Sequence, residues 1–179
     1  RGERVLRLTP SAAERFLPYA GLAELLAQVP DDVVERLPGP QRAAFDTMLV
    51  RRGVQRLMIQ MRVSVLPEIP LVSGRRADLL CLSEKGEFSI VEIKSSIEDF
   101  RVDRKWPEYR LHSDRFFFAS HPEVPQSIFP EECGFILSDG YGAEIMRDAP
   151  EHRLAAATRE HASALVGSSP RGSLALLLL

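Results

Sequence analysis

The residues best suited to do chemistry lie between positions 75 and 94, where two short apolar runs flank Ser83-Glu84-Lys85-Gly86. Asp78 lies in the first run, and the second run ends in Glu92-Ile93-Lys94. Alternate residues of a strand point to the same face, so Glu92 and Lys94 share a face, about 6.5–7 Å apart along the backbone. Two carboxylates beside an ammonium group suit a hard divalent cation such as Mg²⁺, which takes oxygen ligands and keeps several waters.

Whether Asp78 joins this pair depends on the turn between the two runs. A two-residue loop, Lys85-Gly86, would place Asp78 opposite Ile93, and the two acids would then face opposite sides of the sheet. A three-residue loop, Glu84-Lys85-Gly86, pairs Asp78 with Glu92 and puts Gly86 at the left-handed position of that loop type. We predict the three-residue register.

A cation held by Asp78 and Glu92 can acidify a water and neutralise charge on a phosphate, with Lys94 helping to position the water or stabilise the transition state. The alternative is an ion pair at a strand end, which contributes little to stability. The strands expected at 76–82 and 87–94 are apolar on both faces, so charged groups at their ends are costly to bury without a purpose. This cost of burial favours the interpretation that Asp78, Glu92 and Lys94 form a functional site.

Glu68, in the strand expected at 63–72, is a further candidate metal ligand. If Ser73-Gly74 forms a two-residue turn, Glu68 faces away from Asp78, whereas a longer loop brings it round to the same side.

A helix is expected at 41–61 and a second at 97–105, capped by Ser96, with strands at 115–120, 135–138 and 143–147. The order helix, three-stranded meander, helix, strand predicts an α/β fold with a mixed central sheet covered by helices on both sides. Gly53 is expected to weaken the first helix.

Two groups of residues are candidate DNA-binding positions. One polar side of the first helix carries Arg51, Arg52 and Arg56, which suits bidentate phosphate contact or, alternatively, a solvated face. The second group surrounds the end of the 97–105 helix, beside the acids, and comprises Arg101, Arg104, Lys105, Trp106 and Tyr109. Its cations can bind phosphate and its aromatics can stack on unpaired bases, although core packing is the favoured interpretation of Trp106 and Tyr109.

Composition sets broad limits on the class of protein. The 179 residues carry a net charge of −2, so any nucleic-acid contact must come from local basic patches. Cys81 and Cys133 lie 52 positions apart without metal-ligand spacing, which suggests a reduced, cytoplasmic protein. We expect no signal peptide, and no apolar run approaches the roughly 20 residues that span a bilayer.

The motif resembles the PD-(D/E)xK phosphodiesterase superfamily, with Asp78, Glu92 and Lys94 in the three motif positions and alanine instead of proline before Asp78. The wider sequence is similar to the bacterial MmcB-type DNA repair family over about residues 42–158. The matching blocks include Gly74-Arg75-Arg76-Ala77-Asp78, Val91-Glu92-Ile93-Lys94-Ser95-Ser96, Asp103-Arg104-Lys105-Trp106-Pro107-Glu108-Tyr109-Arg110 and Ala149-Pro150-Glu151-His152-Arg153-Leu154.

The resemblance implies a restriction-endonuclease-like αβββαβ core and a nuclease site for DNA repair. Asp78 and Glu92 would bind Mg²⁺ or Mn²⁺, assisted by the Ile93 carbonyl, and DNA and other repair proteins would be the partners, at the nucleoid. The main alternative is a module on the same fold that binds DNA or repair partners without catalysis.

Three segments are expected: a short helical extension at 1–40, including a helix that starts at Ser11, the nuclease-like domain at 41–158, and an atypical tail at 159–179. The resemblance implies a basic amphipathic helix at the end of the family's sequences, whereas residues 166–179 here show no helical stripe.

Overall fold

The computed structural model describes residues 7, 20–26, 28–103 and 105–168 of the chain. Its centre is a six-stranded sheet in which the strands follow chain order from β1 to β6. The strands are β1 (Ser64–Pro70), β2 (Arg76–Leu82), β3 (Phe88–Ile93), β4 (Arg115–Ser120), β5 (Gly134–Ser138) and β6 (Ala143–Arg147). The pairs β3–β4 and β4–β5 are parallel, and the pairs β1–β2, β2–β3 and β5–β6 are antiparallel.

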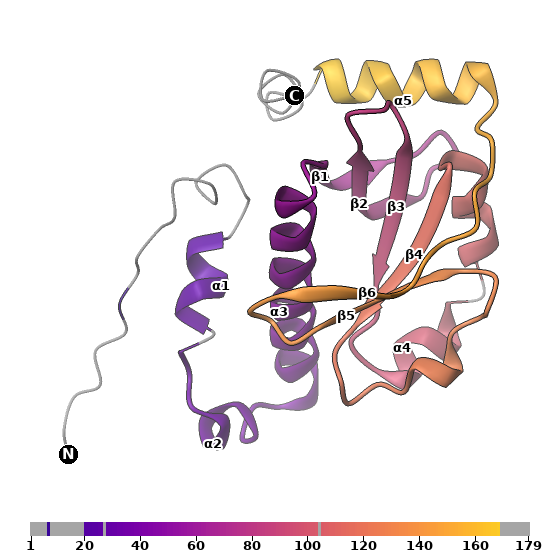
Figure 1. Cartoon of the computed structure of the whole chain (residues 1–179). Helices are drawn as coiled ribbons and strands as arrows, with labels where there is room; N and C mark the ends of the chain where they lie inside the picture. The colour runs from indigo at the N-terminus through magenta and orange to yellow at the C-terminus, as the bar shows by residue number, and fades with distance from the viewer. Residues whose placement is uncertain (1–6, 8–19, 27, 104, 169–179) are drawn as a thin grey trace.

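Helices cover both faces of this sheet (Figure 1). The helical elements are α1 (Ala20–Leu26), α2 (Asp31–Val34), α3 (Gly39–Gln60), α4 (Ile97–Val102), α5 (Ala156–Ser168), and the 3-10 turns η1 (Trp106–His112) and η2 (Gln126–Ile128). The succession α3-β1-β2-β3-α4-β4 confirms the predicted αβββαβ core with a mixed central sheet flanked by helices.

Two apolar clusters account for the two covered faces. On one face, α3 packs Val50, Val54 and Met58 against Leu79 and Val91 of the sheet. The opposite face carries a cluster built largely from aromatic side chains, which α4, η1 and α5 cover: Leu80, Phe88, Ile90, Tyr109, Phe116, Phe118, Phe129, Phe135, Ala162 and Val166. The alternation of apolar side chains along β2 and β3 therefore fills two cores, as expected for central strands.

Gly53 has a packing role in α3 that sequence reasoning missed. A Cβ at this position would lie 2.1 Å from Ser138 Oγ and 2.4 Å from the Gly142 carbonyl oxygen. The absence of a side chain therefore lets α3 approach the β5–β6 hairpin closely, which offsets the usual helix penalty of glycine.

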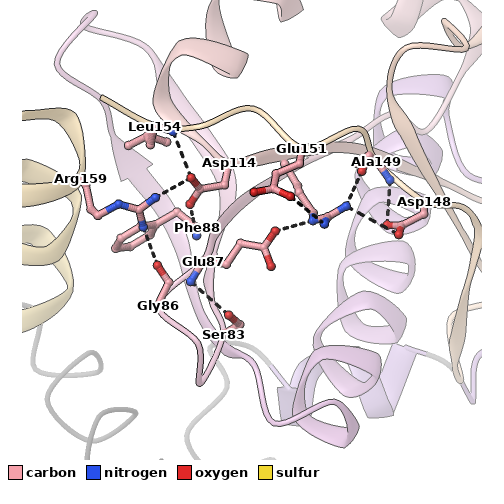
Figure 2. A network of polar contacts seen from close by, with 11 residues as sticks. Ser83, Gly86, Glu87, Phe88, Asp114, Asp148, Ala149, Glu151, Leu154 and Arg159 are labelled. Carbon is pink, nitrogen blue, oxygen red and sulfur yellow. Dashed lines mark hydrogen bonds and ion pairs between the residues drawn. The ribbon is translucent and has the colours of Figure 1, made fainter. Parts of the chain in front are cut away.

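Asp114 joins four segments at the end of the sheet where β3 begins (Figure 2). Its carboxylate accepts hydrogen bonds from the Phe88 amide at 2.8 Å and the Leu154 amide at 3.1 Å. The Arg159 guanidinium, from α5, donates to the same carboxylate at 2.6 Å and to the Gly86 carbonyl at 2.6 Å. This buried, fully used carboxylate anchors α5 to the sheet.

The helix α5 corrects the expected domain boundary at residue 159. It extends to Ser168, and Ala162 and Val166 are buried in the aromatic-rich core, so residues 159–168 belong to the folded domain. Small alanines are spread along this helix and give a weak periodic signal, which is why sequence reasoning missed it. Residues 169–179 and the helix expected from Ser11 lie outside the described residues.

Across the described ranges, no helix is both long enough and apolar enough to cross a bilayer.

Candidate functional site

The β2–β3 hairpin brings Asp78 and Glu92 together. Its ladder pairs Leu82 with Phe88 and Leu79 with Val91, and the next pair in that register is Asp78 with Glu92. The turn is the predicted three-residue loop, because the Ser83 amide donates to the Glu87 carbonyl at 3.0 Å. Gly86 has a φ of 76°, the left-handed conformation that this loop requires.

Backbone amides fix both carboxylates. The Asp78 amide donates to Glu92 Oε1 at 3.1 Å, and the Ile93 amide donates to Asp78 Oδ2 at 2.9 Å. Within the described part of the chain, no hydrogen bond reaches Asp78 Oδ1 or Glu92 Oε2. One carboxylate oxygen of each acid is therefore available to bind a cation.

Lys94 completes the group on the same face of the sheet. Its side chain is only 8% exposed, and its ammonium nitrogen lies 3.9 Å from Glu92 Oε2. Backbone contacts hold this position, since the Lys94 amide donates to the Ala119 carbonyl and Ser120 Oγ donates to the Lys94 carbonyl at 2.6 Å. The three predicted motif residues thus lie together, near the beginning of β2 and the end of β3.

The two acids lie in surroundings that disfavour a pair of negative charges. Burial, followed by the neighbouring Asp78 carboxyl, raises the pKa of Glu92 to about 8. Burial also raises the pKa of Asp78, against the opposing effect of the Ile93 amide. Such a pair needs a shared proton or a bound cation to remain buried at neutral pH.

The donor set fits a hard cation that keeps part of its hydration shell. The described residues contain no group of three or more His, Cys, Asp or Glu side chains able to hold a metal ion. Mg²⁺ nevertheless binds commonly through one or two carboxylates plus waters, and two free carboxylate oxygens suit this mode. The ligand roles of Asp78, Glu92 and the Ile93 carbonyl, with Mg²⁺ or Mn²⁺, stay predictions.

Glu68 lies opposite Asp78 in the β1–β2 register, in a left-handed backbone conformation (φ 56°) that interrupts the ladder. The turn between β1 and β2 is longer than two residues. The Leu71 amide donates to the Arg75 carbonyl at 2.7 Å, around a three-residue loop. A non-glycine residue in this conformation is uncommon, and such strain gathers at functional sites.

The Glu68 carboxylate forms ion pairs with two arginines. Arg51 of α3 contacts one carboxylate oxygen, and Arg76 Nε lies 2.6 Å from the other. The Glu68 charge also contributes to the raised pKa of Asp78, and the Arg51 charge opposes that rise, so both charges act on the site. The role of Glu68 as a metal ligand stays a prediction.

The structure does not bring Arg51, Arg52 and Arg56 together into one phosphate-binding face. Arg52 is buried and donates to the Gly140 carbonyl at 3.1 Å, with its guanidinium 6.0 Å from the Tyr141 ring. Arg56 donates to the Tyr141 carbonyl at 2.9 Å. These two side chains therefore hold the turn between β5 and β6, whereas Arg51 points to β1.

The second group of DNA-binding candidates divides by exposure. Arg101 and Lys105 are exposed, and Arg104 lies outside the described residues. Tyr109 is 8% exposed and packs parallel to Phe116, so its ring has no face open to a base. Trp106 is half-buried and stacks on the same Phe116. The core-packing interpretation of these two aromatics is the one that the geometry supports.

Asp103 is the site neighbour that sequence reasoning missed. Its Oδ2 lies 2.7 Å from the Lys94 ammonium, closer than any Glu92 oxygen. Its position at the expected end of the helix that follows the Glu-x-Lys strand is the sequence signal that could have placed Asp103 near the site.

Comparison with known proteins supplies the family. A profile described as "MmcB-like: DNA repair protein MmcB-like" matches residues 38–172. A solved structure, the SPO1766 protein of unknown function from Silicibacter pomeroyi, is 35% identical and superposes with a TM-score of 0.65. That alignment covers 74% of this chain and 88% of the other. None of the curated proteins matches the chain. With three quarters of its length inside the profile, the chain belongs to the family of MmcB-like DNA repair proteins.

Proposed function

We propose that this MmcB-like protein is a metal-dependent phosphodiesterase of DNA repair, with Asp78, Glu92 and Lys94 as its catalytic residues. The observation that carries the proposal is the cross-strand pairing of Asp78 and Glu92, in which each carboxylate is fixed by a backbone amide of the other strand of the β2–β3 hairpin. Pre-organised side chains of this kind lower the cost of reaching the reactive geometry. The likeness of the motif to PD-(D/E)xK nucleases supports the same activity.

Each residue has a distinct role in the proposal. The free oxygens of Asp78 and Glu92 would hold Mg²⁺ or Mn²⁺, with the Ile93 carbonyl as a further ligand. The bound ion would supply acidification of a water and neutralisation of phosphate charge. Burial lowers the pKa of Lys94, but the hydrogen bond to Asp103 and the charges of Asp103, Asp99 and Glu92 together raise it above its usual value, so Lys94 stays charged. An ammonium ion at this position would stabilise the negative charge that develops on the phosphate.

The substrate in this proposal is damaged or branched DNA. The exposed Arg101 and Lys105 lie on the segment that includes Asp103, so they would contact phosphates on either side of the reacting one.

A nuclease screen tests the function directly. The full chain would be incubated with single-stranded, forked, nicked and cross-linked DNA, with Mg²⁺ or Mn²⁺ and with chelator. We expect metal-dependent cleavage of at least one substrate by the wild type and none by Glu92→Gln. Glu84→Gln is the matched control, since Glu84 is an exposed acid in the loop of the same hairpin.

A second function has its own support. Arg51, Arg52 and Arg56 are engaged within the fold, and a net charge of −2 gives no basic field, so a module that binds repair partners is the competing proposal. Wild-type protein that cleaves none of the substrates, and whose Glu92→Gln variant still supports repair in cells, would favour this second function.

A further inference from the structure

The ammonium group of Lys94 is shared unequally between two acids. It lies 2.7 Å from Asp103 Oδ2 and 3.9 Å from Glu92 Oε2. The shorter contact is a charge-assisted hydrogen bond, whereas the longer one leaves room for another group to approach Glu92. Asp103 therefore determines where the Lys94 charge lies relative to the candidate metal ligand.

Aromatic side chains on both sides of Asp103 hold it in place. Three residues before it, Phe100 packs edge-on against Phe118 with ring centroids 5.4 Å apart. Three residues after it, Trp106 packs against the same Phe118 at 6.0 Å. Phe118 is in turn the β4 partner of Glu92 in the sheet. Phe118 is thus next to Glu92 in the sheet, and its ring also packs against the residues on both sides of Asp103.

Local hydrogen bonds give the Asp103 segment a defined conformation. The helix that precedes it begins with a capping bond from the Asp99 amide to Ser96 Oγ at 3.0 Å. The Asp103 amide donates to the Phe100 carbonyl at 3.1 Å, and Asp103 Oδ1 accepts from the Lys105 amide at 3.1 Å. One carboxylate oxygen thus binds the backbone and the other binds Lys94.

We propose that Asp103 is a positioning residue that holds the Lys94 ammonium away from Glu92, so that Glu92 Oε2 remains available to a divalent cation. The inference rests on the proposed metal-dependent function of the same site. A buried ammonium requires an acceptor, because an unpaired charge in the interior is costly. Without Asp103, the ammonium could move toward Glu92 Oε2, which already lies 3.9 Å away, and Lys94 would then compete with the cation for that oxygen.

The test is a double-mutant cycle in which Mn²⁺ binding to the full chain is measured by titration calorimetry. The proteins are the wild type, Asp103→Asn, Lys94→Met and the variant with both changes. We expect Asp103→Asn to weaken Mn²⁺ binding by roughly tenfold, the scale of coupling between groups in direct contact. In the Lys94→Met background the same change should have almost no effect, because the competing ammonium is gone.

Two further variants separate this role from long-range charge and from folding. Glu98→Gln removes one negative charge from the same segment, and Glu98 is exposed, so we expect binding close to that of the wild type. Asp103→Glu keeps a carboxylate and should restore most of the affinity even if Asp103→Asn folds poorly. Thermal unfolding followed by circular dichroism reports the folding of every variant.

The outcomes distinguish the inference from the proposed function. If the wild type binds no Mn²⁺, both are overturned. If the wild type binds and Asp103→Asn weakens binding equally with and without Lys94, or not at all, only the role of Asp103 is overturned. Loss of affinity in Asp103→Glu as large as that in Asp103→Asn would also overturn it.

Discussion

The side chain of Asp78 on β2 is oriented by a backbone amide of β3, and the side chain of Glu92 on β3 is oriented by a backbone amide of β2. Glu92 Oε1 accepts the amide of Asp78, and Asp78 Oδ2 accepts the amide that follows Glu92. This reciprocal arrangement uses one oxygen of each carboxylate for structure and leaves the other for binding. It also makes the site geometry a direct consequence of the hairpin register.

The raised pKa of Glu92 predicts a pH-dependent effect of Glu92→Gln on stability. In the metal-free protein, burial and the Asp78 carboxyl raise this pKa from 4.5 to about 8. The folded state therefore binds the proton more tightly than the unfolded state. The resulting stabilisation is complete below about pH 4.5 and is lost as the pH rises to about 8.

We expect Glu92→Gln, which stays neutral, to be more stable than the wild type by on the order of 2 kcal/mol at about pH 8.5. At about pH 5 the two proteins should be similarly stable, because wild-type Glu92 is then protonated in the folded state. Urea unfolding in the presence of chelator measures both differences. The two proteins have all other titratable groups in common. A difference in their stability that does not change with pH would therefore contradict this prediction.

Glu92→Gln and Lys94→Ala should separate metal binding from catalysis. Both changes should abolish cleavage if the protein is a nuclease, but Glu92→Gln alone should weaken binding of Mg²⁺ or Mn²⁺ in calorimetry, because it alone removes a ligand charge. Affinity for DNA should survive both changes, since contacts to phosphates elsewhere supply most of it. Normal repair in cells that carry either variant would show that the site is not used catalytically.

Arg52 should matter for stability and not for DNA affinity. Its guanidinium is buried and bonded to the Gly140 carbonyl, so Arg52→Ala should cost about 1–3 kcal/mol by leaving that carbonyl unsatisfied. Arg36→Ala is the control, since Arg36 is highly exposed and pairs with Asp32 of its own segment, and should cost less than about 0.5 kcal/mol. Chemical unfolding measures both.

DNA affinity of the same variants, measured at two salt concentrations, gives the binding comparison. An unchanged salt slope in Arg52→Ala would agree with its structural role, whereas a flatter slope would indicate a lost phosphate contact. The earlier expectation for Arg51 and Arg56 is tested in the same way, by charge reversal at each.

Gly53→Ala should destabilise the protein although alanine is the better helix former. Alanine gains about 1 kcal/mol of helix propensity. The added Cβ would, however, meet Ser138 Oγ at 2.1 Å and the Gly142 carbonyl at 2.4 Å. We expect a net loss of about 2 kcal/mol in unfolding free energy, because the hairpin backbone must move. At Gly142 itself an added Cβ meets nothing within 4 Å, so Gly142→Ala is the control and should be nearly neutral.

The sequence by itself determined the layout of the core and the register of its central hairpin. Apolar residues on both faces of 76–82 and 87–94 require cover on both sides, which α3 and α4 provide. The position of Gly86 selects a three-residue loop, and side-chain alternation then places Asp78 beside Glu92. These are local rules of turns and strands, and they act over a few residues.

Only the tertiary structure decided which partners the charged side chains take. Asp103 reaches Lys94, Arg52 reaches the β5–β6 turn, and Arg159 reaches Asp114, across separations of 9, 88 and 45 positions respectively. Neither periodicity nor turn chemistry specifies such pairings, because each long side chain has several charged groups within its reach. For Asp103, close packing of the aromatic core limits this freedom, because Phe100 and Trp106 on either side of it pack against the same Phe118 ring.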